Sequence, residues 1–153
     1  MDTVEVRRLI AAPATVVFDW ISNAENYAAA PLFLAARLMQ PGYDAPNGTD
    51  AIRRFVFPFG IVQERITHFD PPRSFQYRVI KSVPPVRHEG GSVVLVPKSE
   101  GTELIWGSTA ELRLPILARQ TSRMVFPPLF RRAFTQVVDA AQAAVATTSG
   151  DRR

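Results

Sequence analysis

An arginine and a glutamate, Arg53 and Glu64, occupy positions where both would face an apolar interior. Side chains two residues apart in a strand share a face, so Glu64 shares its face with the apolar residues Val62 and Ile66. In the strand before it, Arg53 shares a face with Phe55. A buried charge is tolerated only when it is paired or hydrogen-bonded. The pattern therefore predicts that the two side chains meet, either as a salt bridge that fixes the sheet or as a polar anchor for a ligand.

Two aromatic residues that carry a polar atom, Tyr77 and Trp106, are predicted to face the same interior. Tyr77 alternates with Phe75 and Val79 along one strand, and Trp106 alternates with Leu104 along another. Rings that bring one polar group into an apolar space are typical of ligand pockets. Either residue taken singly is more often part of a packed core, so the pair favours a pocket only together with other evidence.

Three side chains are candidates for acid–base catalysis, namely Glu64, Tyr77 and His88. In a desolvated cavity, burial raises the pKa of a carboxyl group and lowers that of histidine. His88 and Glu89 precede two glycines at 90–91, where a bulge would disturb the alternation, so the pattern does not decide which of them points inward. The sequence has no nucleophile elbow, phosphate-binding loop or dinucleotide-binding glycine motif. It offers catalytic candidates without a catalytic constellation.

The composition excludes several kinds of site. With no cysteine in the chain, disulfides, thiol catalysis and cysteine–zinc sites are ruled out. The two histidines, His68 and His88, lie far apart and lack the spacing of a metal-binding motif. We therefore expect no metal and no cofactor.

The charge pattern indicates a solvated basic surface. The net charge is +4, and sixteen arginines and two lysines are scattered along the chain without forming a block. We expect no nucleic-acid partner. The first ten residues lack the basic start of a signal peptide and no apolar run is long enough to span a membrane, so we expect a cytoplasmic protein. The pattern says nothing about the oligomeric state.

Seven stretches carry the alternation and the branched or aromatic residues of strands. They are Thr3–Ile10, Leu32–Gln40, Ala51–Phe57, Ile61–Phe69, Phe75–Lys81, Arg87–Val96 and Thr102–Leu112. The connections between the last five are short and rich in proline, glycine and aspartate, which favours tight turns between antiparallel neighbours. The sequence thus predicts one antiparallel sheet.

Helices are predicted after the first strand and after the last strand. A short helix opens at Pro13 and a second covers Ala24–Ala29. The apolar residues of Pro128–Ala146, among them Phe130 and Phe134, recur every three or four residues, which predicts a long amphipathic helix. The prolines at 127–128 mark its start, and Ile116–Met124 could form a separate helical arm before them.

The length of 153 residues and the 46% hydrophobic content fit one domain with its own core. We expect that domain at residues 1–147. The helix is predicted to end near Thr147, where a run of small polar residues and Gly150 begins, and residues 148–153 are expected to form a flexible tail.

The order of these motifs resembles the helix-grip fold of the SRPBCC, or START-like, superfamily, and in particular its polyketide cyclase/dehydrase-like branch. Five segments carry the resemblance: Ile10–Phe18, Asn26-Tyr27, Glu64–Tyr77, Val93–Pro97 and Gly101–Trp106. They span nearly the whole chain. The resemblance implies an α+β fold in which a curved seven-stranded antiparallel sheet surrounds the C-terminal helix, with two short helices after the first strand.

The resemblance also implies a small hydrophobic ligand, such as a lipid, a polyketide or an isoprenoid-like molecule, in a cavity between sheet and C-terminal helix. The residues expected to bind it are Arg53, Phe55, Glu64, Tyr77, Trp106, Phe130 and Phe134. One alternative is a cyclase or aromatase, with Tyr77 or His88 as general acid or base and Arg53 polarising a carbonyl. Another is an interaction protein with a collapsed core. A cavity larger than about 300 Å³ would favour ligand binding or catalysis.

Overall fold

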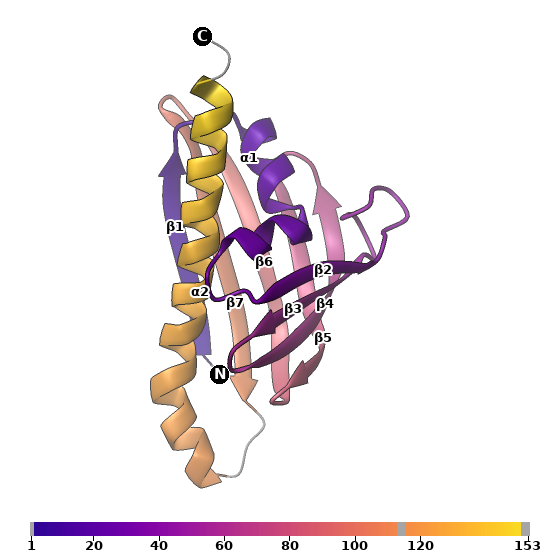
Figure 1. Ribbon diagram of the computed structural model, residues 1–153, viewed down its shortest axis with the longest axis vertical. Helices are drawn as coiled ribbons and strands as arrows, with labels where there is room; N and C mark the ends of the chain where they lie inside the picture. Colours follow the sequence, from indigo (N-terminus) through magenta and orange to yellow (C-terminus); the bar gives the residue numbers. More distant parts are fainter. Residues whose placement is uncertain (1, 113–115, 151–153) are drawn as a thin grey trace.

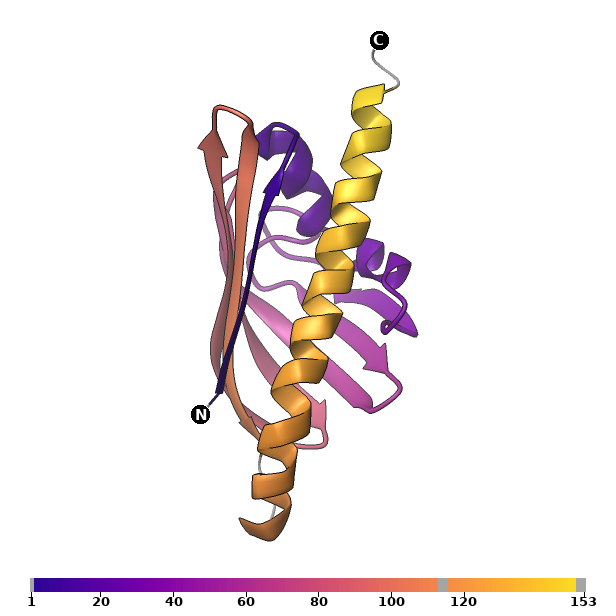
Figure 2. The ribbon, with the colours of Figure 1, turned by 90° about the vertical axis from the view of Figure 1, so that its left-hand side faces the viewer.

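Seven antiparallel strands form one curved sheet in the order β1-β7-β6-β5-β4-β3-β2. The strands are β1 (Asp2–Ile10), β2 (Ala35–Gln40), β3 (Ile52–Phe57), β4 (Gly60–Asp70), β5 (Ser74–Val83), β6 (Val86–Lys98) and β7 (Gly101–Leu112). The computed structural model describes residues 2–112 and 116–150 of the chain. The sheet curves around the long C-terminal helix (Figure 1, Figure 2), so the predicted α+β helix-grip fold is confirmed.

Two short helices follow β1, as the sequence predicts. Helix α1 (Ala14–Ile21) begins directly after Pro13, and the 3₁₀ helix η1 (Ala24–Ala29) begins after Asn23. The Asn23 side chain accepts a hydrogen bond from the backbone N–H of Glu25 at 3.2 Å, which caps the new helix. In Figure 2, α1 lies between the sheet and the upper part of the C-terminal helix, and η1 lies on the other side of that helix, close to β2.

Strand β2 begins at Ala35 and not at Leu32, the predicted start. The residues before it are held in a turn, because the N–H of Phe33 donates to the carbonyl of Ala30 at 2.9 Å. The N–H of Leu32 donates to the side chain of Gln136 in the C-terminal helix at 2.8 Å. The bonds of Leu32 and Phe33 outside the sheet delay the start of β2, although the N–H of Leu34 already donates to the carbonyl of Val56 in the neighbouring strand at 2.8 Å.

The C-terminal helix α2 runs without interruption from Ile116 to Gly150. The predicted separation into an arm and a helix that starts at Pro128 is wrong, because Pro127 and Pro128 lie inside one helix. Each proline removes one N–H from the helix ladder, but its fixed φ near −65° is itself helical. The helix also extends past its predicted end near Thr147. Residues 151–153 lie outside the described residues, and the flexible tail at 148–153 stays a prediction.

Helix α2 packs its apolar stripe on β1, β7, α1 and η1. The buried residues of the stripe are Ala133, Phe134, Val137, Val138, Ala141 and Val145. Polar contacts fix the helix against β1: Arg131 donates to the carbonyl of Glu5 at 2.8 Å, and Arg8 forms an ion pair with Asp139. Of the helices described, none is both long enough and apolar enough to cross a membrane.

Candidate functional site

A cavity of about 110 Å³ lies between the concave face of the sheet and α2. Six rings form much of its wall: Tyr27, Phe33, Phe55, Phe57, Trp106 and Phe134. This volume is below the roughly 300 Å³ expected of a pocket for a drug-sized ligand. It is closer to the roughly 150 Å³ of an apolar cavity that holds one benzene ring. The cavity therefore fits a single ring or the end of a longer molecule.

The rings in the wall hold one another in fixed orientations. Trp106 stacks on Phe134 of α2 with 4.1 Å between ring centroids, and Tyr27 of η1 stacks on Phe55 of β3 at 5.2 Å. Phe33 meets Phe55 edge to face at 5.5 Å. Such offset and edge contacts between rings are favourable beyond the area they bury. The walls of the cavity are thus built from side chains with defined positions.

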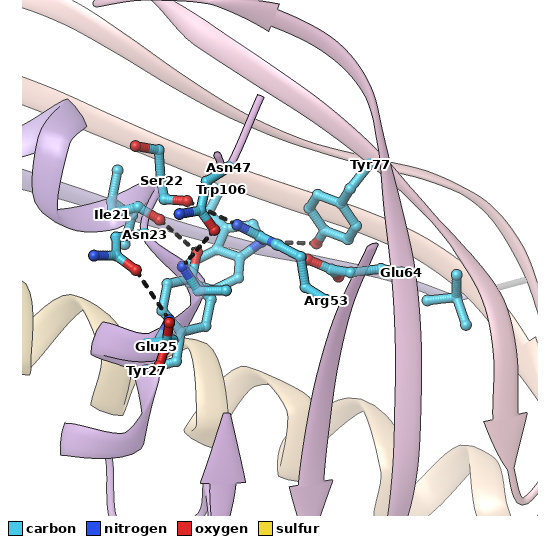
Figure 3. A network of polar contacts seen from close by, with 12 residues as sticks. Ile21, Ser22, Asn23, Glu25, Tyr27, Asn47, Arg53, Glu64, Tyr77 and Trp106 are labelled. Atoms are coloured by element: carbon cyan, nitrogen blue, oxygen red, sulfur yellow. Dashed lines mark hydrogen bonds and ion pairs between the residues drawn. The ribbon is translucent and has the colours of Figure 1, made fainter. Parts of the chain in front are cut away.

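Arg53 and Glu64 meet at one wall of the cavity, as the alternation predicts, with Glu64 in the lining and Arg53 behind it. They are opposite each other in the register of β3 and β4, and their residues are 1% and 5% exposed. Arg53 Nε donates to Glu64 Oε1 at 2.9 Å, and Nη2 donates to the same oxygen. Arg53 Nη1 donates to the carbonyl of Ser22 at 2.9 Å (Figure 3). The guanidinium therefore joins two strands to the turn after α1.

The environment of this pair sets its electrostatics. Burial raises the pKa of the Glu64 carboxyl, and the Arg53 guanidinium opposes that shift. Burial by itself would lower the pKa of Arg53, but the Glu64 carboxylate and the Tyr27 hydroxyl together outweigh burial, and the pKa rises. Three aromatic rings surround the guanidinium, with centroids 5.4 to 5.5 Å from Cζ: Tyr27, Phe55 and Phe75. We conclude that the two side chains form an ion pair, whose attraction compensates their burial.

A second polar group lies in the wall formed by β5, β6 and β7. The Trp106 Nε1–H donates to the Tyr77 hydroxyl at 2.8 Å. The Nδ1 atom of His88 accepts a hydrogen bond from the N–H of Val79 at 3.0 Å, and Nε2 lies 2.6 Å from the Ser108 hydroxyl. Because Nδ1 is an acceptor, a neutral His88 carries its proton on Nε2 and donates it to Ser108.

Two glycines make this arrangement possible. The register of β6 against β7 shifts between His88 and Gly90, and Gly90 has a φ of +139°, a conformation that favours glycine. The bulge settles the question that alternation leaves open: His88 lines the cavity and Glu89 is exposed. A Cβ at Gly91 would overlap the ring of Tyr77, so glycine is required for that ring to lie across β6.

Burial shifts the ionisation of the groups in this wall. It lowers the pKa of His88 to about 4, with a contribution from the positive charge of Arg78. It raises the pKa of the Tyr77 hydroxyl, and the nearby Glu64 carboxylate raises it further. At neutral pH both side chains are therefore uncharged, and each keeps one proton for hydrogen bonding.

Comparison with known proteins identifies the family of this chain. Residues 1–146 match the model of the family described as polyketide cyclase / dehydrase and lipid transport. The chain belongs to this family. No functionally curated protein matches the chain significantly.

Solved structures share the fold at low sequence identity. TTHA0849 from Thermus thermophilus superposes with a TM-score of 0.80 at 17% identity, over 97% of this chain and 99% of that chain. The Zhui aromatase/cyclase from Streptomyces sp. R1128 gives 0.79 at 18% identity, over 94% and 92%. A START superfamily protein from Mycobacterium smegmatis gives 0.70 at 13% identity, over 95% and 98%. At these identities the likeness shows the fold and carries no assignment of residue roles.

For a member of this family, the described residues offer no metal centre. Across residues 2–112 and 116–150, no three His, Asp or Glu side chains lie close enough to share an ion. What the cavity offers instead is a set of hydrogen-bonding groups on one wall of an apolar space. Such a wall is suited to hydrogen bonding with a polar group that enters the space.

The structure brings most of the predicted site residues to the cavity. Its lining includes Phe55, Glu64, Tyr77, His88, Trp106, Phe130 and Phe134. Arg53 is not part of the lining; it contacts Glu64, which stands between the guanidinium and the space. This placement argues against direct contact between Arg53 and a ligand, and equally against its polarising a ligand carbonyl.

Sequence reasoning missed several residues of the lining, among them Tyr27, Phe33 and Ser108. Ser108 follows Trp106 by two residues in β7, so alternation alone could have added it to the list. Tyr27 and Phe33 lie in η1 and in the turn before β2, where neither the helical nor the strand period applies. No pattern in the sequence marks them as lining residues.

Proposed function

We propose that this protein binds a small apolar molecule, the size of one ring or the end of a longer chain, between the sheet and α2. The observation that carries the proposal is a gap in the core that aromatic rings with fixed orientations line. Its polar groups lie at the Arg53–Glu64 pair and at the wall of Tyr77, His88 and Ser108. Close packing is the rule in protein interiors, and a gap that rings hold open is typical of a binding site. The family, whose description includes lipid transport, supports the same class of ligand.

A filling variant tests the proposal. Val62 lines the cavity, whereas Val56, in the neighbouring strand β3, alternates with the buried Phe55 and Phe57 and faces the other side of the sheet. Val62→Phe should abolish binding of a single-ring hydrocarbon such as α-methylstyrene, followed by titration calorimetry, and Val56→Phe should leave it unchanged. Native mass spectrometry of the purified protein should also show a bound small molecule that Val62→Phe lacks. Equal binding to both variants would contradict the proposal.

A second candidate is a cyclase- or aromatase-type enzyme, and one observation favours it. The Tyr77 hydroxyl, kept protonated by burial, faces an apolar space in which a proton donor could polarise a carbonyl group. His88 is less suited to act as a base, because both of its ring nitrogens are engaged. In an enzyme, Tyr77→Phe should lower turnover of a polyketide-like substrate far more than its binding. Equal losses of turnover and binding would favour the binding function.

A further inference from the structure

The polar wall of the cavity contains more hydrogen-bond donors than acceptors. Trp106 and His88 each contribute an N–H, and Tyr77 and Ser108 each contribute an O–H. Among the described residues of this wall, the acceptor atom His88 Nδ1 is already taken by the N–H of Val79, which leaves the two hydroxyl oxygens as acceptors for these four protons. The Tyr77 oxygen accepts from Trp106, and the Ser108 oxygen accepts from His88.

The two hydroxyl protons then have at most one partner between them. The two hydroxyls are neighbours through His88, which bonds to Ser108 and stacks on the Tyr77 ring at 5.5 Å between centroids, and a hydrogen bond between them would use one of the two protons. Among the residues the structure describes, no other acceptor is in contact with either hydroxyl. At least one O–H is therefore left over. Because Tyr77 and Ser108 both line the cavity, that proton is presented to whatever occupies it.

The other charged groups in the lining restrict the ligand further. Three acidic side chains border the cavity, those of Asp2, Glu64 and Glu111. No lysine or arginine is among the lining residues described. The positive charge of Arg53 is directed at Glu64, whose Oε1 accepts two of its three hydrogen bonds, while the third goes to the carbonyl of Ser22. A carboxylate or phosphate would therefore enter a space with acidic neighbours and no cation to receive it.

From this geometry we infer that the ligand is a neutral molecule with a carbonyl-type oxygen, which accepts a hydrogen bond from the Tyr77–Ser108 pair while its apolar body lies among the rings. The inference rests on the proposed binding function and adds the chemical class of the ligand. His88 acts here as a positioning residue: by donating to the Ser108 oxygen, it leaves the Ser108 proton free to turn toward Tyr77 or the ligand.

Three single-ring probes test the inference by titration calorimetry at pH 7. Acetophenone carries the carbonyl oxygen, α-methylstyrene replaces that oxygen with a methylene group of similar shape, and benzoate carries a negative charge. One net hydrogen bond should make acetophenone bind roughly tenfold more tightly than α-methylstyrene to the unaltered protein. Benzoate should bind at least about tenfold more weakly than acetophenone.

Substitutions show which hydroxyl groups produce the preference for acetophenone, because the two single variants and the double variant should differ. Ser108→Ala leaves the Tyr77 proton free, and Tyr77→Phe leaves the Ser108 proton free, so each single variant should keep most of the preference for acetophenone. The double variant should lose it, with a ratio near 1. Ser92→Ala, on β6 between the buried residues Gly91 and Val93, is the matched control and should keep the full ratio.

The outcomes separate the two proposals. If α-methylstyrene and acetophenone bind the unaltered protein equally well, binding is supported and the inferred carbonyl class is overturned. If benzoate binds best, the inferred neutrality is overturned. If none of the probes binds, the proposed function and the inference fall together. Since the ratio in the unaltered protein decides the question, the test does not depend on the double variant folding.

Discussion

The two ends of the space between sheet and α2 use the same strands and the same helix, yet one is closed and the other is hollow. At the closed end, α1 fills the space with three side chains that are at most 2% exposed, Val17, Phe18 and Ile21. Phe18 meets Phe69 and Phe75 with centroids 5.4 and 6.1 Å apart. At the other end, η1 contributes Tyr27 to the lining, and aromatic rings form much of the walls.

The difference shows what closes a helix-grip core. The side chains of an inserted helix, Val17, Phe18 and Ile21, interdigitate with those of the sheet, and such interiors approach the packing density of a crystal. Flat rings that stack in pairs, such as Trp106 on Phe134, make their favourable contacts with each other. The space beyond such a pair stays unfilled. The Arg53–Glu64 pair lies at the boundary, where Arg53 bonds to the turn that follows α1. We therefore expect changes at the closed end to affect stability and changes at the hollow end to affect binding.

The largest difference should appear between Phe18→Ala and Phe134→Ala. Phe18 is packed on all sides, so its truncation should lower the free energy of unfolding by about 4 to 5 kcal/mol. Phe134 already borders a cavity, and its loss should lower the free energy by about 2 to 3 kcal/mol, because fewer contacts disappear. Urea denaturation of both variants measures the difference. Equal losses would show that the two ends are packed alike.

Removal of one charge at the boundary should have the next largest effect. Glu64→Gln leaves the Arg53 guanidinium buried without its counter-charge, and we expect a loss of about 3 to 4 kcal/mol in the free energy of unfolding. The control is Glu103→Gln, which breaks a surface ion pair with Arg7 and should cost less than about 1 kcal/mol.

The same Glu64→Gln preparation also distinguishes a structural role of Glu64 from a ligand contact. We expect a large fall in the melting temperature with a modest change in ligand affinity. Unchanged stability with weakened binding would instead mean that the carboxylate serves the ligand. If neither stability nor binding changed, Glu64 would have no part in the site.

The pairing of Arg53 with Glu64 could be predicted because it depends only on alternation within strands and on a tight hairpin between them. The same holds for the inward direction of Tyr77 and Trp106, which are 4% and 3% exposed. These properties follow from the period of a strand, which is fixed by the backbone. They need no knowledge of distant contacts.

Other features depend on contacts that no local pattern contains. The direction of His88 is set by the bulge at Gly90, and a bulge inserts one residue and reverses the alternation beyond it. The shortened β2 results from the bond between Leu32 and Gln136, more than a hundred residues along the chain. The cavity volume depends on how rings from five elements stack, so the sequence alone could not give it.

The smallest effect we expect is a dependence of stability on pH that comes from His88 at the hollow end. The unfolded chain binds a proton on His88 near pH 6.5, whereas the folded protein binds it only near pH 4, chiefly because of burial. Acidification through this window therefore favours the unfolded chain: stability is full above pH 6.5 and falls toward pH 4. The full shift corresponds to about 3 kcal/mol, and partial exposure of the ring reduces the expected loss to about 1 to 2 kcal/mol.

Two variants isolate this contribution from the other groups that titrate in acid. His88→Gln can still accept from Val79 and donate to Ser108, but it does not titrate, so the difference in stability between it and the unaltered protein should change by about 1 to 2 kcal/mol between pH 6.5 and pH 4. His68→Gln removes the other, exposed histidine and controls for the substitution itself. A protonated His88 would turn an Nδ1 donor toward the N–H of Val79, so acid should also loosen the wall that orients the ligand. If the difference in stability between His88→Gln and the unaltered protein stays constant over this range, folding does not lower the pKa of His88, and the ring is not held neutral by the wall.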